Sequence, residues 1–129
     1  MSTPIAELLQ WIQMEPLSAG YVPSRGAWAE SEANADRRIV SLIATGGRTP
    51  GVIERYPQIR VGIFGRRGER NAAGAVADLE AFAEALMQRA QTEFKSGCLT
   101  QIRPLGDITG PGYTLEDRPW YEINFEVIV

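Results

Sequence analysis

Alternation of apolar and polar side chains over residues 120–129 (WYEINFEVIV) is the feature that most restricts the fold. The odd-numbered residues from 121 to 129 are apolar, whereas Glu122, Asn124 and Glu126 lie between them. Because successive side chains of a strand point to opposite faces of a sheet, this pattern predicts a half-buried strand. Residues 58–64 (QIRVGIF) alternate in the same way and predict a second one.

A long helix is predicted over residues 72–96, with Asn71 as its cap and Gly97 where helices often stop. Its apolar residues recur at steps of three and four and form one stripe, which consists of Val76, Leu79, Phe82, Ala83, Leu86, Ala90 and Phe94. A short N-terminal helix is also expected, because Thr3 can cap it, Pro4 suits its first position and Pro16 ends it.

Further strands are predicted with weaker patterns. Residues 38–44 (RIVSLIA) are rich in β-branched side chains and stop at a turn signal, Thr45-Gly46-Gly47. Residues 98–103 form a short candidate strand, and residues 104–119 read as turns. The region around Tyr21 predicts a strand or two edge pieces, followed by a mobile polar loop at 30–36.

The element order indicates an α+β fold formed as a single domain over residues 1–129. We expect a mainly antiparallel sheet of four to five strands, with one long helix and one short N-terminal helix packed on one face. The other face is where function is to be sought, and its predicted polar residues are Arg60, Arg103, Glu122, Asn124 and Glu126.

Composition excludes several kinds of chemistry. The chain has no histidine and one cysteine, Cys98, so histidine-dependent triads and zinc sites cannot form within it. We expect no catalytic residue, no cofactor and no bound metal. A net charge of -3 argues against a general nucleic-acid surface, and no apolar run is long enough to span a membrane. The N-terminus lacks a secretion signal, which indicates a cytoplasmic origin.

Two motifs have competing interpretations. Gly62, Gly65 and Gly68 lie between a strand and a helix as in a dinucleotide-binding turn, but their spacing does not fit that turn and Gly62 lies inside the strand. A tight strand-to-helix connection is therefore favoured. The acidic residues Asp107, Glu116 and Asp117 could hold a divalent cation or could be solvated turn residues.

Arginine and aromatic residues suggest protein contacts. The chain has twelve arginines against one lysine, and three of them gather at 66–70, where an anion or a protein partner could bind. Aromatic and arginine side chains are enriched in the hot spots of protein–protein interfaces. Each aromatic residue could instead cover the edge of the hydrophobic core. The candidate interface residues are Arg60, Arg66, Arg67, Arg70, Tyr21, Trp28, Tyr113 and Trp120.

Several segments together resemble the tail terminator proteins of long-tailed bacteriophages, which have also been described as minor tail or minor capsid proteins. The resemblance rests on the element order, the alanine-rich helix and the alternating C-terminal strand. Its quoted segments are Gly20-Tyr21-Val22-Pro23, RIVSLIATGGRTP (38–50), PQIRVGIFGRRG (57–68) and IRPLGDITGPG (102–112).

The resemblance implies a non-enzymatic assembly protein that caps the tail tube as a ring and provides the surface joining the head. Its implied partners are copies of itself, as a hexamer, together with the major tail tube protein and a head-completion or connector protein. DNA would pass through the ring without sequence-specific binding, and no membrane partner is expected. The protein would reside in the tail or neck of the virion after assembly in the host cytoplasm. The alternatives are another head-tail connector, or a ferredoxin-like enzyme or ligand-binding domain using Arg60, Glu122 or the Asp107/Asp117 turn.

Overall fold

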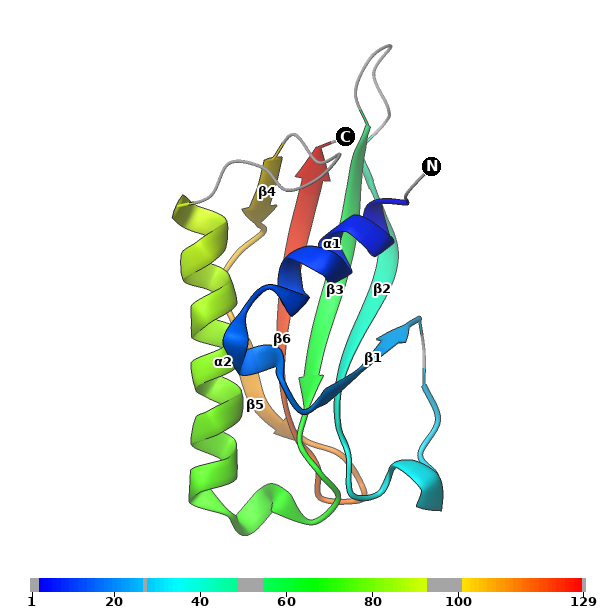
Figure 1. The fold of residues 1–129 in the computed structure, drawn as a ribbon, viewed down its shortest axis with the longest axis vertical. Helices are drawn as coiled ribbons and strands as arrows, with labels where there is room; N and C mark the ends of the chain where they lie inside the picture. The colour runs from blue at the N-terminus through cyan, green and yellow to red at the C-terminus, as the bar shows by residue number, and fades with distance from the viewer. Residues whose placement is uncertain (1–2, 27, 49–54, 93–100, 129) are drawn as a thin grey trace.

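The computed structural model describes residues 3–26, 28–48, 55–92 and 101–128. It contains two α-helices, α1 (Pro4–Gln13) and α2 (Ala73–Thr92), and three short 3-10 helices, η1 (Pro16–Ser18), η2 (Glu32–Asn34) and η3 (Glu69–Asn71). The strands are β1 (Tyr21–Arg25), β2 (Arg38–Arg48), β3 (Tyr56–Phe64), β4 (Gln101–Pro104), β5 (Thr109–Tyr113) and β6 (Pro119–Ile128). The α+β class predicted from the sequence is confirmed (Figure 1).

All six strands join one sheet in the order β1-β2-β3-β6-β4, and β5 also pairs with β6. β1 runs parallel to β2, whereas the other pairings are antiparallel. The sheet therefore has six strands rather than the predicted four to five. The strand missed within the predicted turn region is β5, whose sequence TGPGY has poor strand propensity and is paired along β6 with a register shift.

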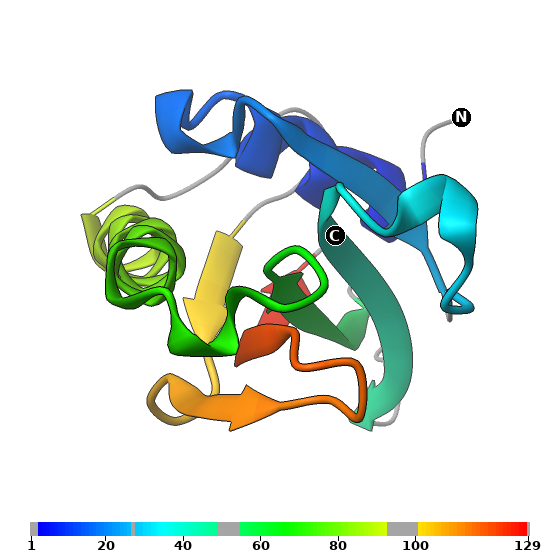
Figure 2. The same cartoon turned by 90° about the horizontal axis from the view of Figure 1, so that it is seen from below.

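Both helices pack on the same side of the sheet, as predicted. Figure 2 shows the sheet curving around them. The Thr3 hydroxyl accepts a hydrogen bond from the Ala6 amide at 3.2 Å, which confirms the expected cap of α1. The buried core joins both helices to alternate residues of β2, β3 and β6, and its fully buried members include Leu8, Trp11, Ile12, Leu42, Ile59, Val61, Ile63, Leu79, Phe82, Leu86, Ile123 and Phe125.

The predicted turn at Thr45-Gly46-Gly47 is wrong. β2 continues to Arg48, and its pairing with β3 passes from Ala44–Ile59 to Gly47–Pro57, so β2 carries one extra residue. That pattern is a β-bulge. Gly47 adopts a φ of 136°, and a Cβ atom there would lie 2.2 Å from the carbonyl oxygen of Tyr56. The double glycine therefore shapes a long strand instead of ending a short one.

The predicted mobile loop at 30–36 instead contains η2, which is closed by a capping box between Ser31 and Asn34. α2 begins at Ala73, and the predicted cap, Asn71, ends η3 instead. Three predictions fall outside the described residues. They are the last part of the long helix, beyond Thr92, the residue Cys98, and the first residues of the strand at 98–103.

Candidate protein-interaction surface

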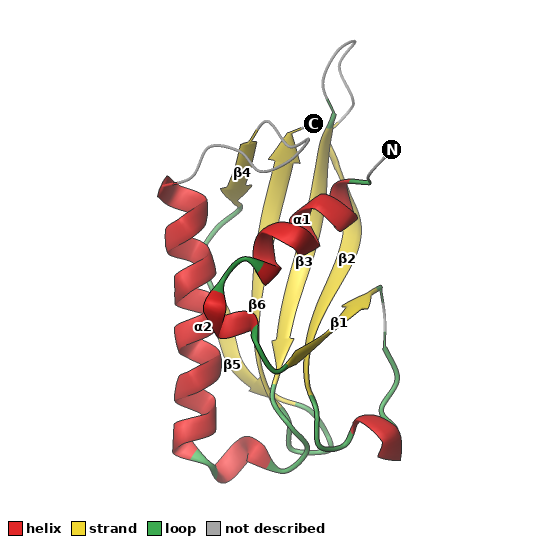
Figure 3. Cartoon of the chain, in the orientation of Figure 1, coloured by secondary structure: helices red, strands yellow, loops and turns green. Residues whose placement is uncertain are grey.

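Three connections meet at one end of the molecule, the lower end in Figure 3. They comprise residues 28–37 before β2, residues 65–72 between β3 and α2, and residues 114–118 between β5 and β6. We call this region the connection end. It contains Arg66, Arg67, Arg70 and Trp28 of the predicted interface residues, and Tyr113 and Trp120 border it on β5 and β6.

The three arginines of the β3–α2 connection make contacts within the chain. Arg66 donates from Nε to the Asp36 carbonyl oxygen at 3.0 Å, and Arg67 pairs with Glu30 and Glu32, each at 3.0 Å. Arg70 pairs with Asp117 at 3.6 Å, and its guanidinium lies 4.5 Å from the centre of the Tyr113 ring. These contacts hold the connections against one another. Arg66 and Arg70 still keep 45% and 51% of their side-chain surface exposed.

Arg118 is the central residue of this end, and the sequence interpretation missed it. Its side chain is fully buried, and it donates to the carbonyl oxygens of Asn34, Arg37 and Gly65 at 2.6, 2.8 and 2.9 Å. It also donates to both carboxylate oxygens of Glu30, at 2.7 and 3.0 Å. One arginine in the turn-like stretch LEDRP carries no pattern that separates it from a solvated charge.

Paired charges lower two carboxylate pKa values at the connection end. The hydrogen bonds from Arg118 hold the pKa of Glu30 below its ordinary value, and Arg67 adds to this effect against the opposing influence of burial. Burial raises the pKa of Glu69, but hydrogen bonds from Arg38 and from the Arg66 amide outweigh it, so that pKa is lowered too. Both groups are therefore held as carboxylates.

The aromatic residues at the connection end are fixed by packing. The Trp28 ring meets Phe64 edge to face at 5.2 Å between centres and lies 5.0 Å from the Arg118 guanidinium. Trp120 lies against Gly112, where an added Cβ atom would lie 2.1 Å from the nearest atom of the indole ring. Tyr113 keeps 39% of its surface exposed. Of these rings, Tyr113 is the most available to a partner.

Tyr21 and Arg60 lie away from the connection end. Tyr21 packs on Phe82 in the helix-covered layer, at 4.7 Å between ring centres, and burial raises the pKa of its hydroxyl. Arg60 lies on the uncovered face of the sheet and pairs with Glu122 at 3.7 Å. On the same face Arg103 pairs at 3.2 Å with Glu126, whose side chain is only 1% exposed. The uncovered face is thus polar, with oppositely charged side chains paired across neighbouring strands.

Two of the glycines and two of the three acidic residues make contacts or turns within the chain. Gly65 packs against Pro119, and Gly68 has a φ of 82° before η3, which fits a tight connection rather than a nucleotide-binding turn. Asp107 accepts a hydrogen bond from the Ile108 amide at 2.7 Å, whereas Asp117 faces Arg70. Within the described ranges, no three His, Cys, Asp or Glu side chains gather as they would around a metal ion.

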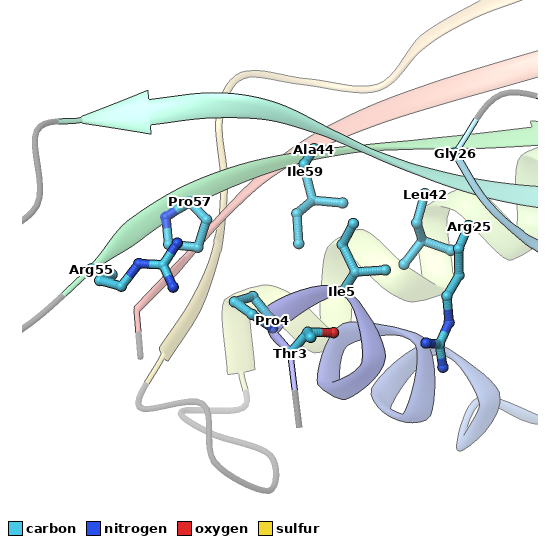
Figure 4. A pocket seen from close by; sticks show the side chains of 10 residues that line it. All are labelled: Thr3, Pro4, Ile5, Arg25, Gly26, Leu42, Ala44, Arg55, Pro57 and Ile59. Carbon is cyan, nitrogen blue, oxygen red and sulfur yellow. The ribbon is translucent and has the colours of Figure 1, made fainter. Parts of the chain in front are cut away.

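A pocket of about 360 Å³ opens on the helix-covered side, between the start of α1 and strands β2 and β3. Figure 4 shows the Arg25 and Arg55 side chains on two sides of an apolar floor. The lining consists of Thr3, Pro4, Ile5, Arg25, Gly26, Leu42, Ala44, Arg55, Pro57 and Ile59. No carboxylate is among these ten described residues, which therefore include no pair of acidic groups for acid-base catalysis. Neither Arg60 nor Glu122 lines it.

Comparison with known proteins decides the family. The family model of the phage tail termination protein matches residues 1–129. This chain belongs to that family. A search of curated proteins found no match. Tail termination proteins are structural proteins of the bacteriophage tail, so the chain is identified as a structural tail component. None of its described helices has the length and apolar character needed to cross a membrane.

Proposed function

We propose that this tail termination protein caps the end of the tail tube as a hexameric ring, stops growth of the tube and presents the surface to which the head is joined. The observation that carries the proposal is the family match over residues 1–129. The partners are other copies of the chain, the major tail tube protein and a head-completion or connector protein. DNA passes through the ring without sequence-specific contacts.

Two open sheet edges support assembly into a ring. Among the described strands, β1 pairs with β2 alone, while β4 and β5 pair with β6 alone. The two edges therefore lie at opposite sides of the sheet and differ in sequence. A closed ring needs a contact in which one patch of a subunit meets a different patch of the next subunit. Unpaired strand edges provide backbone groups for such a contact.

The connection end is a candidate surface for the tube or the head. It gathers Arg66, Arg70 and Tyr113, all partly exposed, on a framework fixed by the buried Arg118. A preorganised surface loses little conformational entropy when it binds. The protein acts here as a binding component without a catalytic step, in the tail or neck of the virion, and it assembles in the host cytoplasm.

Electron microscopy of the full chain tests this proposal. Purified protein is mixed with tail tubes made without it, and the tubes are imaged in negative stain and their lengths measured. We expect rings at tube ends and no further growth when tube protein is added. A protein that never touches tube ends, or that leaves tube growth unchanged, would refute the proposal. Binding to filled, tailless heads in place of tubes would identify a head-completion protein instead.

A further inference from the structure

The turn between β5 and β6 presents one leucine to solvent. Leu115 is 98% exposed, although its neighbours Thr114 and Glu116 are partly covered. Glu116 adds a carboxylate beside it, for which the described residues provide no hydrogen-bonding or ionic partner. Asp117 follows, and its carboxylate faces Arg70 at 3.6 Å. An exposed apolar side chain is thus followed by two acidic residues.

Hydrogen bonds fix the backbone of this turn on both sides. The Asp117 amide donates to the Thr114 carbonyl, and the Thr114 amide donates to the Arg118 carbonyl, both at 3.0 Å. The β3–α2 connection holds the outside of the turn, because the amides of Gly68 and Arg70 donate to the carbonyl oxygens of Glu116 and Asp117 at 3.1 and 3.0 Å. The turn is therefore a rigid projection, with Leu115 at its tip.

The pocket at the start of α1 has the complementary character. Its floor and walls are apolar and include Ile5, Leu42 and Ile59. Arg25 and Arg55 stand on two sides of it (Figure 4), and within the described part of the chain neither makes a hydrogen bond or an ion pair. An apolar side chain accompanied by carboxylates would fit this site, because the side chain would pack on the apolar floor and the carboxylates would pair with the two guanidinium groups.

The projection and the pocket cannot meet within one chain. Strand β3 runs from Ile59 at the pocket to Phe64, which pairs with Trp120 next to the β5–β6 turn. Five residues of strand span roughly 17 Å. In Figure 1 the start of α1, which lines the pocket, lies in the upper part of the molecule, and the connection between β5 and β6 lies at the lower end. They are thus two different patches of one surface, as a head-to-tail contact between identical subunits requires.

We propose that Leu115 of one copy inserts into the pocket of a second copy, with Glu116 and Asp117 facing Arg25 and Arg55. This inference rests on the proposed ring and specifies the contact that builds it. It assigns the β5–β6 turn of the connection end to a neighbouring copy and leaves the β3–α2 connection to the tube or the head. The occupant of the pocket is a second copy of this chain, and the argument for it is the match of charge and of apolar surface between the two sites. In a ring closed through this contact, every Leu115 is buried in a neighbour and every pocket is occupied.

Disulfide trapping tests the contact directly. The full chain carries Leu115→Cys and Ala44→Cys in a Cys98→Ser background, and it is oxidised at tube ends and analysed by non-reducing electrophoresis. We expect covalent dimers and higher multimers, because position 44 lines the pocket. The matched control replaces Ala44→Cys with Ile43→Cys, which pairs with Arg60 and lies on the opposite face of the same strand, and is expected to give no multimers.

The outcomes separate the two proposals. Rings that cap tubes without a bridge between positions 44 and 115 would overturn the inference and leave the proposed function standing. A protein that never binds tube ends would overturn both. Multimers formed equally by the control pair would also overturn the inference, because that result shows unspecific collision of the thiols.

A mixing experiment provides a second, non-covalent measurement. Leu115→Asp removes the projection, and Ala44→Glu places a carboxylate in the pocket. Each variant alone is expected to bind neighbours at least about tenfold more weakly, whereas Leu17→Asp, at another exposed leucine, is expected to behave like the parent. The two variants mixed together keep one intact contact, so a dimer of one copy of each is expected. A mixture that stays monomeric at concentrations where the parent assembles would overturn the inference.

Discussion

Arg118 holds both carboxylate oxygens of Glu30, with Nε 2.7 Å from Oε1 and Nη2 3.0 Å from Oε2. The pair joins the segment before β2 to the turn before β6, two regions that are 88 positions apart in the sequence. Arg118 is fully buried, whereas Glu30 keeps 21% of its side-chain surface exposed. The arginine therefore depends on this partner, because an unpaired buried charge is very unfavourable.

Removing the carboxylate of Glu30 is expected to destabilise the protein strongly. Glu30→Ala leaves the buried Arg118 guanidinium without its counter-ion, and we expect the free energy of unfolding to fall by about 3 kcal/mol. Urea denaturation followed by tryptophan fluorescence measures this change. Glu32→Ala is the matched control, since Glu32 is 92% exposed and pairs only with Arg67 among the residues described. Equal losses for the two variants would contradict the structural role of the Arg118–Glu30 pair.

Acid is expected to destabilise the protein through Glu30 and Glu69. Both pKa values are lowered in the folded chain, whereas the pKa of a glutamate in an unfolded chain is about 4.3. The unfolded state therefore binds more protons as the pH falls below that value, and the free energy of unfolding decreases. Urea denaturation between pH 7 and pH 3 measures it. We expect a plateau at neutral pH, a decrease in acid, and a smaller decrease for the Glu69→Gln variant.

The two glycines of the β2 bulge are expected to respond differently to alanine. At Gly47 an added Cβ atom would clash with the carbonyl oxygen of Tyr56. At Gly46, which has a φ of 95°, no atom of the described residues, apart from Gly46 itself and its two chain neighbours, lies within 4 Å of an added Cβ atom. Gly46→Ala is expected to cost about 1–2 kcal/mol from backbone strain alone. Gly47→Ala should cost more, because the strand must also shift. Thermal unfolding of the two variants gives the comparison, and a larger loss at Gly46 would contradict the bulge.

Two ion pairs on the uncovered face of the sheet are expected to differ in strength. Arg60→Ala breaks a half-exposed pair and is expected to lower the free energy of unfolding by less than about 1 kcal/mol. Arg103→Ala removes a charged partner from the buried Glu126 carboxylate, so a loss of about 1.5–3 kcal/mol is expected. Chemical denaturation of both variants tests this order. The reverse order would show that Glu126 does not depend on Arg103.

The periodicity of apolar residues predicted those helices and strands whose local sequence pattern determines their structure. The alternation in β3 and β6 and the apolar stripe of α2 are local patterns, and the structure has these elements within a few residues of the predicted ranges. β5 could not be predicted, because its glycines and proline signal a turn and only its pairing with β6 makes it a strand. The continuation of β2 through two glycines depends in the same way on its partner strand.

The candidate surface was predictable in its location but not in its organisation. The group at Arg66–Arg70 does lie in a strand-to-helix connection, as glycines and arginines after an alternating strand indicate. Its anchoring by Glu30 and Arg118 depends on contacts between distant segments, which no local pattern records. The exposure of Leu115 likewise could not be predicted, since only the folded chain shows that this leucine points into solvent.

The position of β6 in the sheet also affects biosynthesis. β3, β4 and β5 all pair with β6, yet all three precede it in the chain. During translation these strands leave the ribosome before the strand that joins them exists. Until residues 119–128 emerge, β3 lacks its partner on one edge and the apolar side chains of β6 are missing from the core, a stage at which aggregation competes with folding. Completion of the sheet therefore waits for β6, the last of its described strands to be synthesised.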